Sequence, residues 1–450
     1  MTSEYCNKKY GDSMDSLWSN TAQMPSFERL NRDLKTDVLI IGGGLAGLLC
    51  AYFLDREGVD YSLVEAGRIC NSVSARTTAK ITSQHGLIYD RLSKQFGMQN
   101  ARLYWQSQEQ ALAQYRILCR DIDCDFEEQD AYVYGTNCIR PLLDELNALE
   151  KMGCPAQLCD HIELPVETVG AIRFGNQAQF HPLKFAANIA KGLRIYENTK
   201  ALEFDGRNVV TDGGTITADK IIVTTHFPLF NKHGGYFLKL YQSRSYVMAL
   251  KNAPKISGMY VDEAENGFSF RTAQGLLLLG SGGHRTGKQS DGWMAAQRFA
   301  KRHYPKAQER YRWATQDCMS LDGMAYIGQY SESTPNLYVA TGFNKWGMTS
   351  SMTAGMLLKD LVLEKQNPYA DLFSPARTVL RKQLWLNLAE TAASFLTPTT
   401  PRCPHLGCAL KWNAQEHSWD CSCHGSRFSK EGKLLNNPST DDLGKQTRKQ

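Results

Sequence analysis

The chain has 450 residues, of which 42% are hydrophobic and 22% charged, and this length predicts two or three soluble globular domains rather than one. Its 51 basic and 46 acidic side chains give a formal net charge of +5, and because the basic residues are scattered, nothing indicates nucleic-acid binding. No apolar run is long enough for a transmembrane segment, and the 13 cysteines, mostly dispersed along the chain, favour a reducing, cytoplasmic location.

Residues 1–34 form a polar N-terminal extension that lacks the basic-then-apolar layout of a signal peptide. After it, the apolar run Thr36–Ile41 predicts a buried parallel strand, followed by a helix over Leu45–Glu57 and a second strand over Val59–Val64.

The turn between the first strand and the helix carries a G-x-G-x-x-G pattern made by Gly42, Gly44 and Gly47. In this context the pattern is typical of a dinucleotide site. Gly42 permits the tight turn, Gly44 lets the backbone approach a pyrophosphate, and Gly47 allows the helix to pack closely on the strand. Glu65, at the end of the second strand, is expected to accept hydrogen bonds from ribose hydroxyl groups.

The middle of the chain is expected to contain both helices and strands. Helices are expected at Met98–Asp123, Pro141–Met152 and Pro182–Leu193, and strands at Ile195–Phe204, Val209–Thr217, Ser243–Lys251 and Gly258–Thr272. His181 is expected to have a structural role at a helix start. Further on, a strand over Leu337–Ala340 leads through a glycine-rich loop into a helix over Ser351–Lys365, whose N-terminus could stabilise negative charge on a cofactor.

Several segments resemble the flavin-dependent D-amino acid oxidase (DAO) superfamily over residues 35–378. These are the loop with Arg76, Thr77 and Thr78, the strand Lys220–His226, the Asp322–Gly328 box, and the closing motif with Gly342, Trp346, Gly347, Met348 and Thr349. The resemblance implies FAD as a cofactor and an α/β fold. A discontinuous Rossmann-like FAD-binding domain would take residues 35–95, 165–230 and 318–378, and an inserted mixed α+β substrate domain would take 96–164 and 231–317.

The sequence offers fewer candidates for catalytic residues than for cofactor-binding residues. His284 and Arg285 could lie near the flavin ring, although a plain polar turn is an equal alternative. Arg244 and Arg271, on expected strands, could hold a substrate carboxylate or serve as ordinary surface ion partners. Cys318 does not have the spacing for a covalent flavin link, so we expect a buried, unreactive thiol.

The C-terminal part contains Cys403 and His405, then Cys421 and His424. Two thiolates and two imidazoles suit a [2Fe–2S] centre with one iron held by sulfur and the other by nitrogen. A structural Cys2His2 zinc site is the alternative. The additional cysteines 408 and 423 and the Gly425-Ser426 pair favour the cluster.

These boxes resemble the Rieske domain of the bc-complex type. The resemblance implies that Cys403 and Cys421 hold one iron and that His405 and His424 hold the other. It also implies a Cys408–Cys423 disulfide and a hydrogen bond from Ser426 to the cluster. Phe428 stands where high-potential members have tyrosine, which predicts a reduction potential in the lower part of the Rieske range.

The Rieske segment, residues 403–450, follows a short Pro/Thr-rich linker at 379–402 and is a small, truncated all-β unit. Because so short a segment rarely supports its own core, we expect it either to dock on the FAD domain or to be an impaired version of the fusion.

Together, the two resemblances imply a FAD-dependent oxidoreductase. It would oxidise an amine or amino-acid-like small molecule and pass electrons one at a time through the cluster to a partner, such as a ferredoxin-like protein or a quinone. Two alternatives remain: an electron-transfer flavo-iron–sulfur protein that serves a partner redox enzyme, and a flavoprotein with a structural zinc site at its C-terminus.

Overall fold

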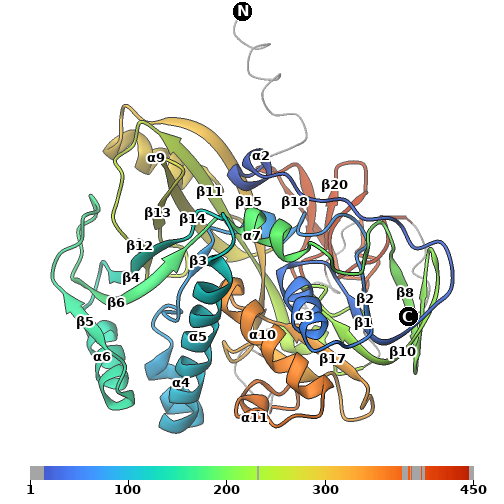
Figure 1. Cartoon of the computed structure of the whole chain (residues 1–450). Helices are drawn as coiled ribbons and strands as arrows, with labels where there is room; N and C mark the ends of the chain where they lie inside the picture. The colour runs from blue at the N-terminus through green and yellow to red at the C-terminus, as the bar shows by residue number, and fades with distance from the viewer. Residues whose placement is uncertain are drawn as a thin grey trace, which may run out of the picture.

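A computed structural model describes residues 15–230, 233–377, 384–385, 387, 397 and 401–444 (Figure 1). Three β-sheets make up this part of the chain, and helices contact the two larger ones. The predicted α/β class, with a small all-β unit at the C-terminus, is confirmed. None of the described helices is both long and apolar enough to cross a membrane.

The first sheet has eight strands, and its central ones are parallel. The strands are β1 (Leu34–Ile41), β2 (Tyr61–Val64), β7 (Ile195–Tyr196), β8 (Ala201–Asp205), β9 (Asn208–Thr211), β10 (Gly214–Val223), β16 (Tyr326–Gln329) and β17 (Leu337–Thr341). Helices α3 (Leu45–Arg56) and α10 (Gly347–Val362) pack against each other beside it. Strands β1, β10 and β17 are almost fully buried at their C-terminal ends, as expected for the centre of a parallel sheet.

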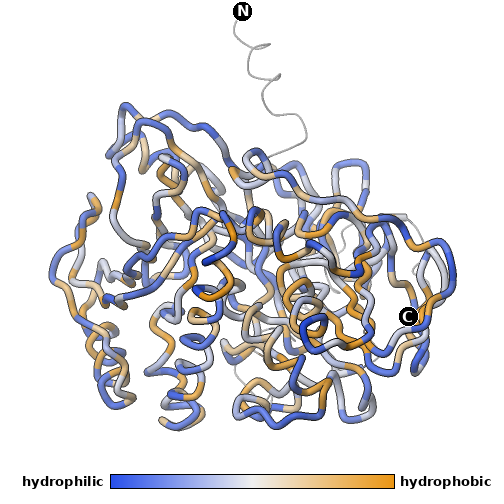
Figure 2. Tube along the Cα trace, viewed as in Figure 1, coloured by the Kyte–Doolittle hydropathy of each residue, from blue (hydrophilic) through white to orange (hydrophobic). Residues whose placement is uncertain are grey.

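The second sheet has nine strands in a mixed arrangement. They are β3 (Lys80–Ile81), β4 (Glu127–Gly135), β5 (Ala156–Cys159), β6 (Gly170–Gln179), β11 (Leu240–Lys251), β12 (Met259–Asp262), β13 (Ser269–Ala273), β14 (Leu276–Arg285) and β15 (Gln308–Ser320). Four helices accompany it: α4 (Tyr89–Phe96), α5 (Met98–Cys119), α6 (Arg140–Met152) and α9 (Met294–His303). Helices α4, α5 and α6 pack together, and hydrophilic and hydrophobic residues are interspersed along each of them (Figure 2).

Shorter elements tie these layers together. They are α2 (Leu17–Thr21), the 3-10 helix η1 (Val73–Arg76), α7 (Pro182–Ile189), α8 (Tyr236–Lys239) and α11 (Ala370–Phe373). The described part of the N-terminal extension is packed on the body, because Trp18 is buried and donates to the carbonyl of Thr77 at 2.7 Å. His181 caps the start of α7 by accepting from the amide of Lys184, which confirms its structural role.

The third sheet is small and antiparallel, with the strands β18 (Leu410–Asn413), β19 (Ser418–Cys421), β20 (Arg427–Ser429) and β21 (Leu434–Asn436) in that order. Its buried apolar cluster consists of four cysteines with Leu410 and Phe428. So small a core gives little stability by itself, and the third sheet depends on its contacts with the rest of the chain.

Three predicted strands are wrong in their extent. The expected strand Ile195–Phe204 is divided into β7 and β8, and Val209–Thr217 is a hairpin of β9 and β10. Gly258–Thr272 likewise turns back on itself between β12 and β13. In each case a short turn that includes a positive-φ or closely packed residue interrupts the apolar pattern, as Asn198 does before β8. Most of the predicted linker lies outside the described residues.

Candidate functional site

A cavity of about 560 Å³ lies where the three sheets meet. Its wall includes the glycine turn after β1, residues of β11, β14 and β15, and the loop around α10's N-terminus. The segment from Leu434 to Thr440 of the third sheet also contributes to it, with Pro438 as the exception. One cavity therefore receives side chains from all three layers of the fold.

The glycine turn has the geometry that the sequence predicts. A methyl group on Gly47 would lie 1.9 Å from the carbonyl oxygen of Gly42, so only glycine fits there. A methyl group on Gly44 would have Ser74 Oγ as its nearest neighbour, at 3.6 Å, and Gly44 lines the cavity. The turn is thus tight on its inner side and open toward the cavity, where the N-terminus of α3 favours an anion.

Glu65 also lines the cavity and braces this turn. Its carboxylate accepts from the backbone amides of Gly43 at 2.7 Å and Gly67 at 2.8 Å. Burial raises the pKa of Glu65, and the two amides partly oppose that rise. The sequence anticipated Glu65 as a cofactor residue, but not its hydrogen bonds to the turn.

Most of the other expected flavin residues meet at the same cavity. Thr77, Thr78, Gly342, Trp346, Gly347 and Met348 line it, whereas Arg76 and Thr349 lie behind the wall. Arg76 donates to the carbonyls of Asn71 and Ser72, and so fixes the loop that carries the two threonines.

His85 is a residue of this region that sequence reasoning missed. Its ring stacks on Trp346 with 4.8 Å between centroids, and its Nε2 lies 3.0 Å from Thr349 Oγ1. Burial lowers the pKa of His85 to about 3, so the ring is neutral. A histidine outside any motif gives no sequence signal for such a supporting role.

The catalytic candidates lie elsewhere, since the cavity lining contains none of Arg244, His284 and Arg285. The Arg244 guanidinium pairs with Glu416. Arg285 donates to the carbonyls of Ser422 and Cys423, both at 2.9 Å. These two arginines join the nine-stranded sheet to the third sheet instead of facing the cavity.

The remaining candidates are also held by protein groups. His284 stacks on Tyr246, and its Nδ1 lies 2.9 Å from the carbonyl of Gly282. Arg271 is buried and donates to the carbonyls of Thr78 and Ala79, each at 2.7 Å, so it shapes the cavity loop rather than serving as a surface ion partner. Burial raises the pKa of Cys318 to about 12, as expected for an unreactive thiol.

A second site lies in two loops, one before β18 and one after β19. The imidazole rings of His405 and His424 are 5.0 Å apart between centroids. Both ring nitrogens of His405 and Nδ1 of His424 are buried and have no hydrogen-bond partner among the described residues. Orphaned buried nitrogens are costly, and metal ligation would compensate them. The residues present therefore fit a metal centre.

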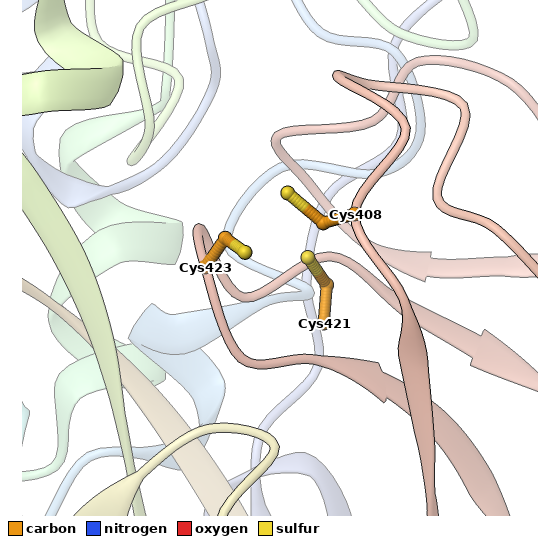
Figure 3. Close-up of side chains that lie close together, drawn as sticks. All are labelled: Cys408, Cys421 and Cys423. Carbon is orange, nitrogen blue, oxygen red and sulfur yellow. The ribbon is translucent and has the colours of Figure 1, made fainter. Parts of the chain in front are cut away.

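The sulfur atoms of this pocket support the same conclusion. Figure 3 shows the side chains of Cys408, Cys421 and Cys423 close together. Their Sγ atoms lie within 4.8 Å of one another. Cys403 is buried in the same cluster. The described part of the structure holds no disulfide bond, so the predicted Cys408–Cys423 bond is not formed in it. The Sγ atoms of Cys408 and Cys423 are nevertheless neighbours in this pocket.

Ser426 and Phe428 lie directly behind this pocket, and both are fully buried. The Oγ of Ser426 accepts from the amide of Ser439 at 2.9 Å. Its hydroxyl proton is then available for an acceptor in the pocket, since a hydroxyl can accept and donate at once.

The third sheet docks against the other two. Gln316 on β15 donates to the carbonyl of Gly425 at 2.9 Å, and Asn437 donates to the carbonyl of Thr225 at 2.7 Å. His405 and His424 lie edge-on to Phe227 and Phe237. Of the two expectations for so short a segment, the structure therefore shows docking.

Comparisons with known proteins agree with both sites. The family of FAD dependent oxidoreductases (DAO) matches residues 37–361, and the Rieske [2Fe-2S] domain matches residues 377–446, which begins before the predicted start at 403. The Rieske 2Fe-2S iron-sulfur protein YhfW of Bacillus subtilis is 34% identical over 95% of this chain and 97% of its own.

More distant relatives share the larger part alone. The gamma-glutamylputrescine oxidoreductase of Escherichia coli is 24% identical over 77% of this chain and 88% of its own. The crystal structure of glycine oxidase from Geobacillus kaustophilus has the same fold, with a TM-score of 0.65 at 21% identity, over 77% of this chain and all of that one. The chain belongs to the DAO family of FAD-dependent oxidoreductases, an enzyme family whose FAD-binding fold is joined here to a C-terminal Rieske domain with its [2Fe–2S] cluster.

Proposed function

We propose that this oxidoreductase removes two electrons from an amine or amino-acid-like substrate and passes them singly through its Rieske domain. Converting a C–N single bond into C=N releases two electrons and two protons; a bound flavin takes electrons in pairs, and a [2Fe–2S] cluster carries one at a time. The names of the relatives support the substrate class, because one acts on gamma-glutamylputrescine and another on glycine.

The observation that carries this proposal is a direct contact between the cavity and the loop after β19, called here the cluster loop because it carries His424. His226 lines the cavity, and its Nε2 lies 3.1 Å from Oε1 of Gln242. Gln242 in turn packs so closely on Gly425 that a methyl group there would lie 2.2 Å from its Cγ. Two side chains thus connect the FAD cavity to the residue after His424, which is a short path for intramolecular electron transfer.

For the FAD we propose the residues of the cavity wall. Gly42, Gly44 and Gly47 would admit the pyrophosphate, and Glu65 would face the ribose. Thr77, Thr78, Gly342, Trp346, Gly347 and Met348 would surround the rest of the cofactor, with Arg76 and Thr349 supporting them. We also propose the division into a discontinuous FAD-binding domain and an inserted substrate domain that the sequence predicts.

For the cluster we propose Cys403 and Cys421 on one iron, and His405 and His424 on the other. The orphaned imidazole nitrogens and the adjacent thiols support this set. We retain the Cys408–Cys423 disulfide as part of the proposal, because these sulfur atoms are neighbours. Ser426 would donate its hydroxyl proton to a sulfur of the site.

The destination of the electrons is proposed on chemistry alone. A one-electron carrier that is not itself a terminal acceptor requires a partner, such as a ferredoxin-like protein or a quinone. The many buried cysteines support a reducing location, and we propose the cytoplasm.

Anaerobic reduction with candidate substrates tests the proposal. The purified protein is mixed with amines and amino acids while flavin absorbance and the EPR signal of a reduced His/Cys-ligated cluster are followed. We expect the flavin to bleach first and the cluster signal to follow. In His424→Ala the bleaching should persist and the cluster signal should be lost.

The control variant is His417→Ala, since His417 is an exposed histidine of the same domain. It should behave like the wild type. If no amine or amino acid bleaches the flavin, but a reduced protein partner does, the chain is an electron-transfer protein. Zinc without iron at the C-terminal site would refute the proposed electron path.

A further inference from the structure

The cavity wall contains a carboxylate that the cofactor proposals leave unused. Asp317 lines the cavity from β15. Among the described residues no hydrogen bond or salt bridge to its carboxylate is found, and Lys345 and Arg244 act on it only through space. Burial raises the pKa of Asp317 to about 6, against the influence of those two cations. Asp317 is partly exposed, and a carboxylate without a partner in a cavity wall is open to a ligand that supplies its counter-charge.

Neighbouring polar groups are also left without partners. Thr315, two residues before Asp317, is on the same face of β15, and its Oγ1 is buried with no hydrogen-bond partner in the described chain. The same is true of Ser281 Oγ on β14, and both residues line the cavity. Hydroxyl oxygens can accept from N–H donors, so Thr315 and Ser281 add two further acceptors to this wall.

The arginines of this region are unavailable for a substrate carboxylate. Arg244 is paired with Glu416, Arg271 is bound to backbone carbonyls, and Arg285 is bound to the cluster loop. Arg68 is the one arginine among the lining residues that the structure describes, and its Nε lies 3.0 Å from Glu197. The lysines of the wall, Lys80, Lys200 and Lys345, are point charges that cannot make the planar two-pronged contact of a guanidinium.

We propose that Asp317 binds a substrate ammonium group, and that the substrate is therefore a diamine or a related cationic amine rather than an α-amino acid recognised through its carboxylate. One amino group would be oxidised in its neutral form while Asp317 holds the other as a cation. This inference rests on the proposed function, because it assigns the substrate of the same cavity.

The test uses four probes of similar size: 1,4-diaminobutane, butylamine, 4-aminobutanoate and glycine. Anaerobic flavin bleaching gives rates and KM values, and calorimetric titration of the oxidised holoenzyme gives binding without turnover. We expect 1,4-diaminobutane to be the best substrate. Asp317→Asn should raise its KM and its Kd on the order of 10- to 100-fold, with a smaller effect on butylamine.

Two further variants separate recognition from structure. Asp317→Glu should recover part of the affinity, because it restores the charge. Asp219→Asn is the control, since Asp219 is an exposed aspartate that pairs with Arg207 and does not line the cavity. It should leave the KM for 1,4-diaminobutane unchanged.

The outcomes for the inference and for the proposed function differ. If 1,4-diaminobutane reduces the flavin equally well in wild type and Asp317→Asn, or if glycine is the preferred substrate, the assignment of Asp317 is overturned and the amine oxidation stands. If 1,4-diaminobutane binds to the wild type in an Asp317-dependent way but no amine bleaches the flavin, the cation site is supported and the proposed oxidation fails. Absence of both binding and bleaching by the diamine refutes the inference.

Discussion

The Nε of Arg244 lies 2.8 Å from Oε1 of Glu416, in a pair whose side chains are only 7% and 6% exposed. Arg427 approaches the same carboxylate at 3.0 Å and also pairs with Asp420. One carboxylate therefore holds an arginine of the nine-stranded sheet and an arginine of the Rieske domain together, in the interface between them.

Glu416→Gln should be strongly destabilising. It removes the negative charge between two buried arginines, and breaking such a buried pair costs about 3–5 kcal/mol. Urea unfolding, followed by fluorescence and by release of iron, measures the change. Arg298→Gln breaks the Arg298–Asp291 pair, whose side chains are more than half exposed, and should cost less than about 1 kcal/mol. Equal effects of the two changes would show that the Glu416 charge does not hold the interface.

The same carboxylate predicts a response to acid. Burial would raise the pKa of Glu416, but Arg244 and Arg427 hold it at about 2, below its ordinary 4.5. A lowered folded-state pKa stabilises the fold above the unfolded value, and this stability is lost as the pH falls from about 4.5 toward 2. The urea midpoint of the wild type should fall more steeply between pH 5 and pH 3 than that of Glu416→Gln. Parallel slopes would contradict the prediction.

Replacing Gly47 and replacing Gly44 by alanine should impair the protein for different reasons. Gly47→Ala places a methyl group against the carbonyl of Gly42 and should lower stability by about 1–3 kcal/mol even without FAD. Gly44→Ala has room in the protein alone, but it fills space on the cavity side. Its apoprotein should unfold like the wild type while its FAD content, measured from absorbance, falls several-fold. Full FAD occupancy in Gly44→Ala would remove the support for pyrophosphate binding at this turn.

Ser426 should tune the potential of the cluster. Its buried hydroxyl has a proton left to donate, and hydrogen bonds to cluster sulfur raise the reduction potential. Ser426→Ala should therefore lower the potential measured by EPR-monitored redox titration. Ser429→Ala is the control, because the Ser429 hydroxyl is bonded to Glu431 on the exposed side of the domain. An unchanged potential in Ser426→Ala would mean that the hydroxyl points away from the cluster.

The cofactor motifs were predictable because their chemistry is local in sequence. The glycine turn needs only a strand, a few glycines and a helix in succession, and Cys403, His405, Cys421 and His424 lie within two short loops. The roles of Arg244 and Arg285 were not predictable in this way. Their partners Glu416, Ser422 and Cys423 are more than 130 residues away, in a segment whose docking depends on the tertiary fold.

Strand boundaries and the role of residues inside the cavity were also not predictable from local sequence. Apolar runs such as Val209–Thr217 fit one strand or two, and the turn at Gly213 and Gly214 decides between them. Asp317 has no motif around it that marks a ligand-facing residue. Its significance comes from the absence of a partner in the described structure, which no sequence pattern records.

Because Leu434 to Asn437, Ser439 and Thr440 form part of the wall of the cavity proposed for FAD, the two cofactors would share one thermodynamic cycle. Any ligand that binds only the folded form stabilises it, so a cluster that orders the Rieske domain also strengthens retention of FAD, and FAD strengthens retention of the cluster by the same factor. Scarcity of iron would then reach beyond the cluster and release flavin from a domain that contains no iron ligand.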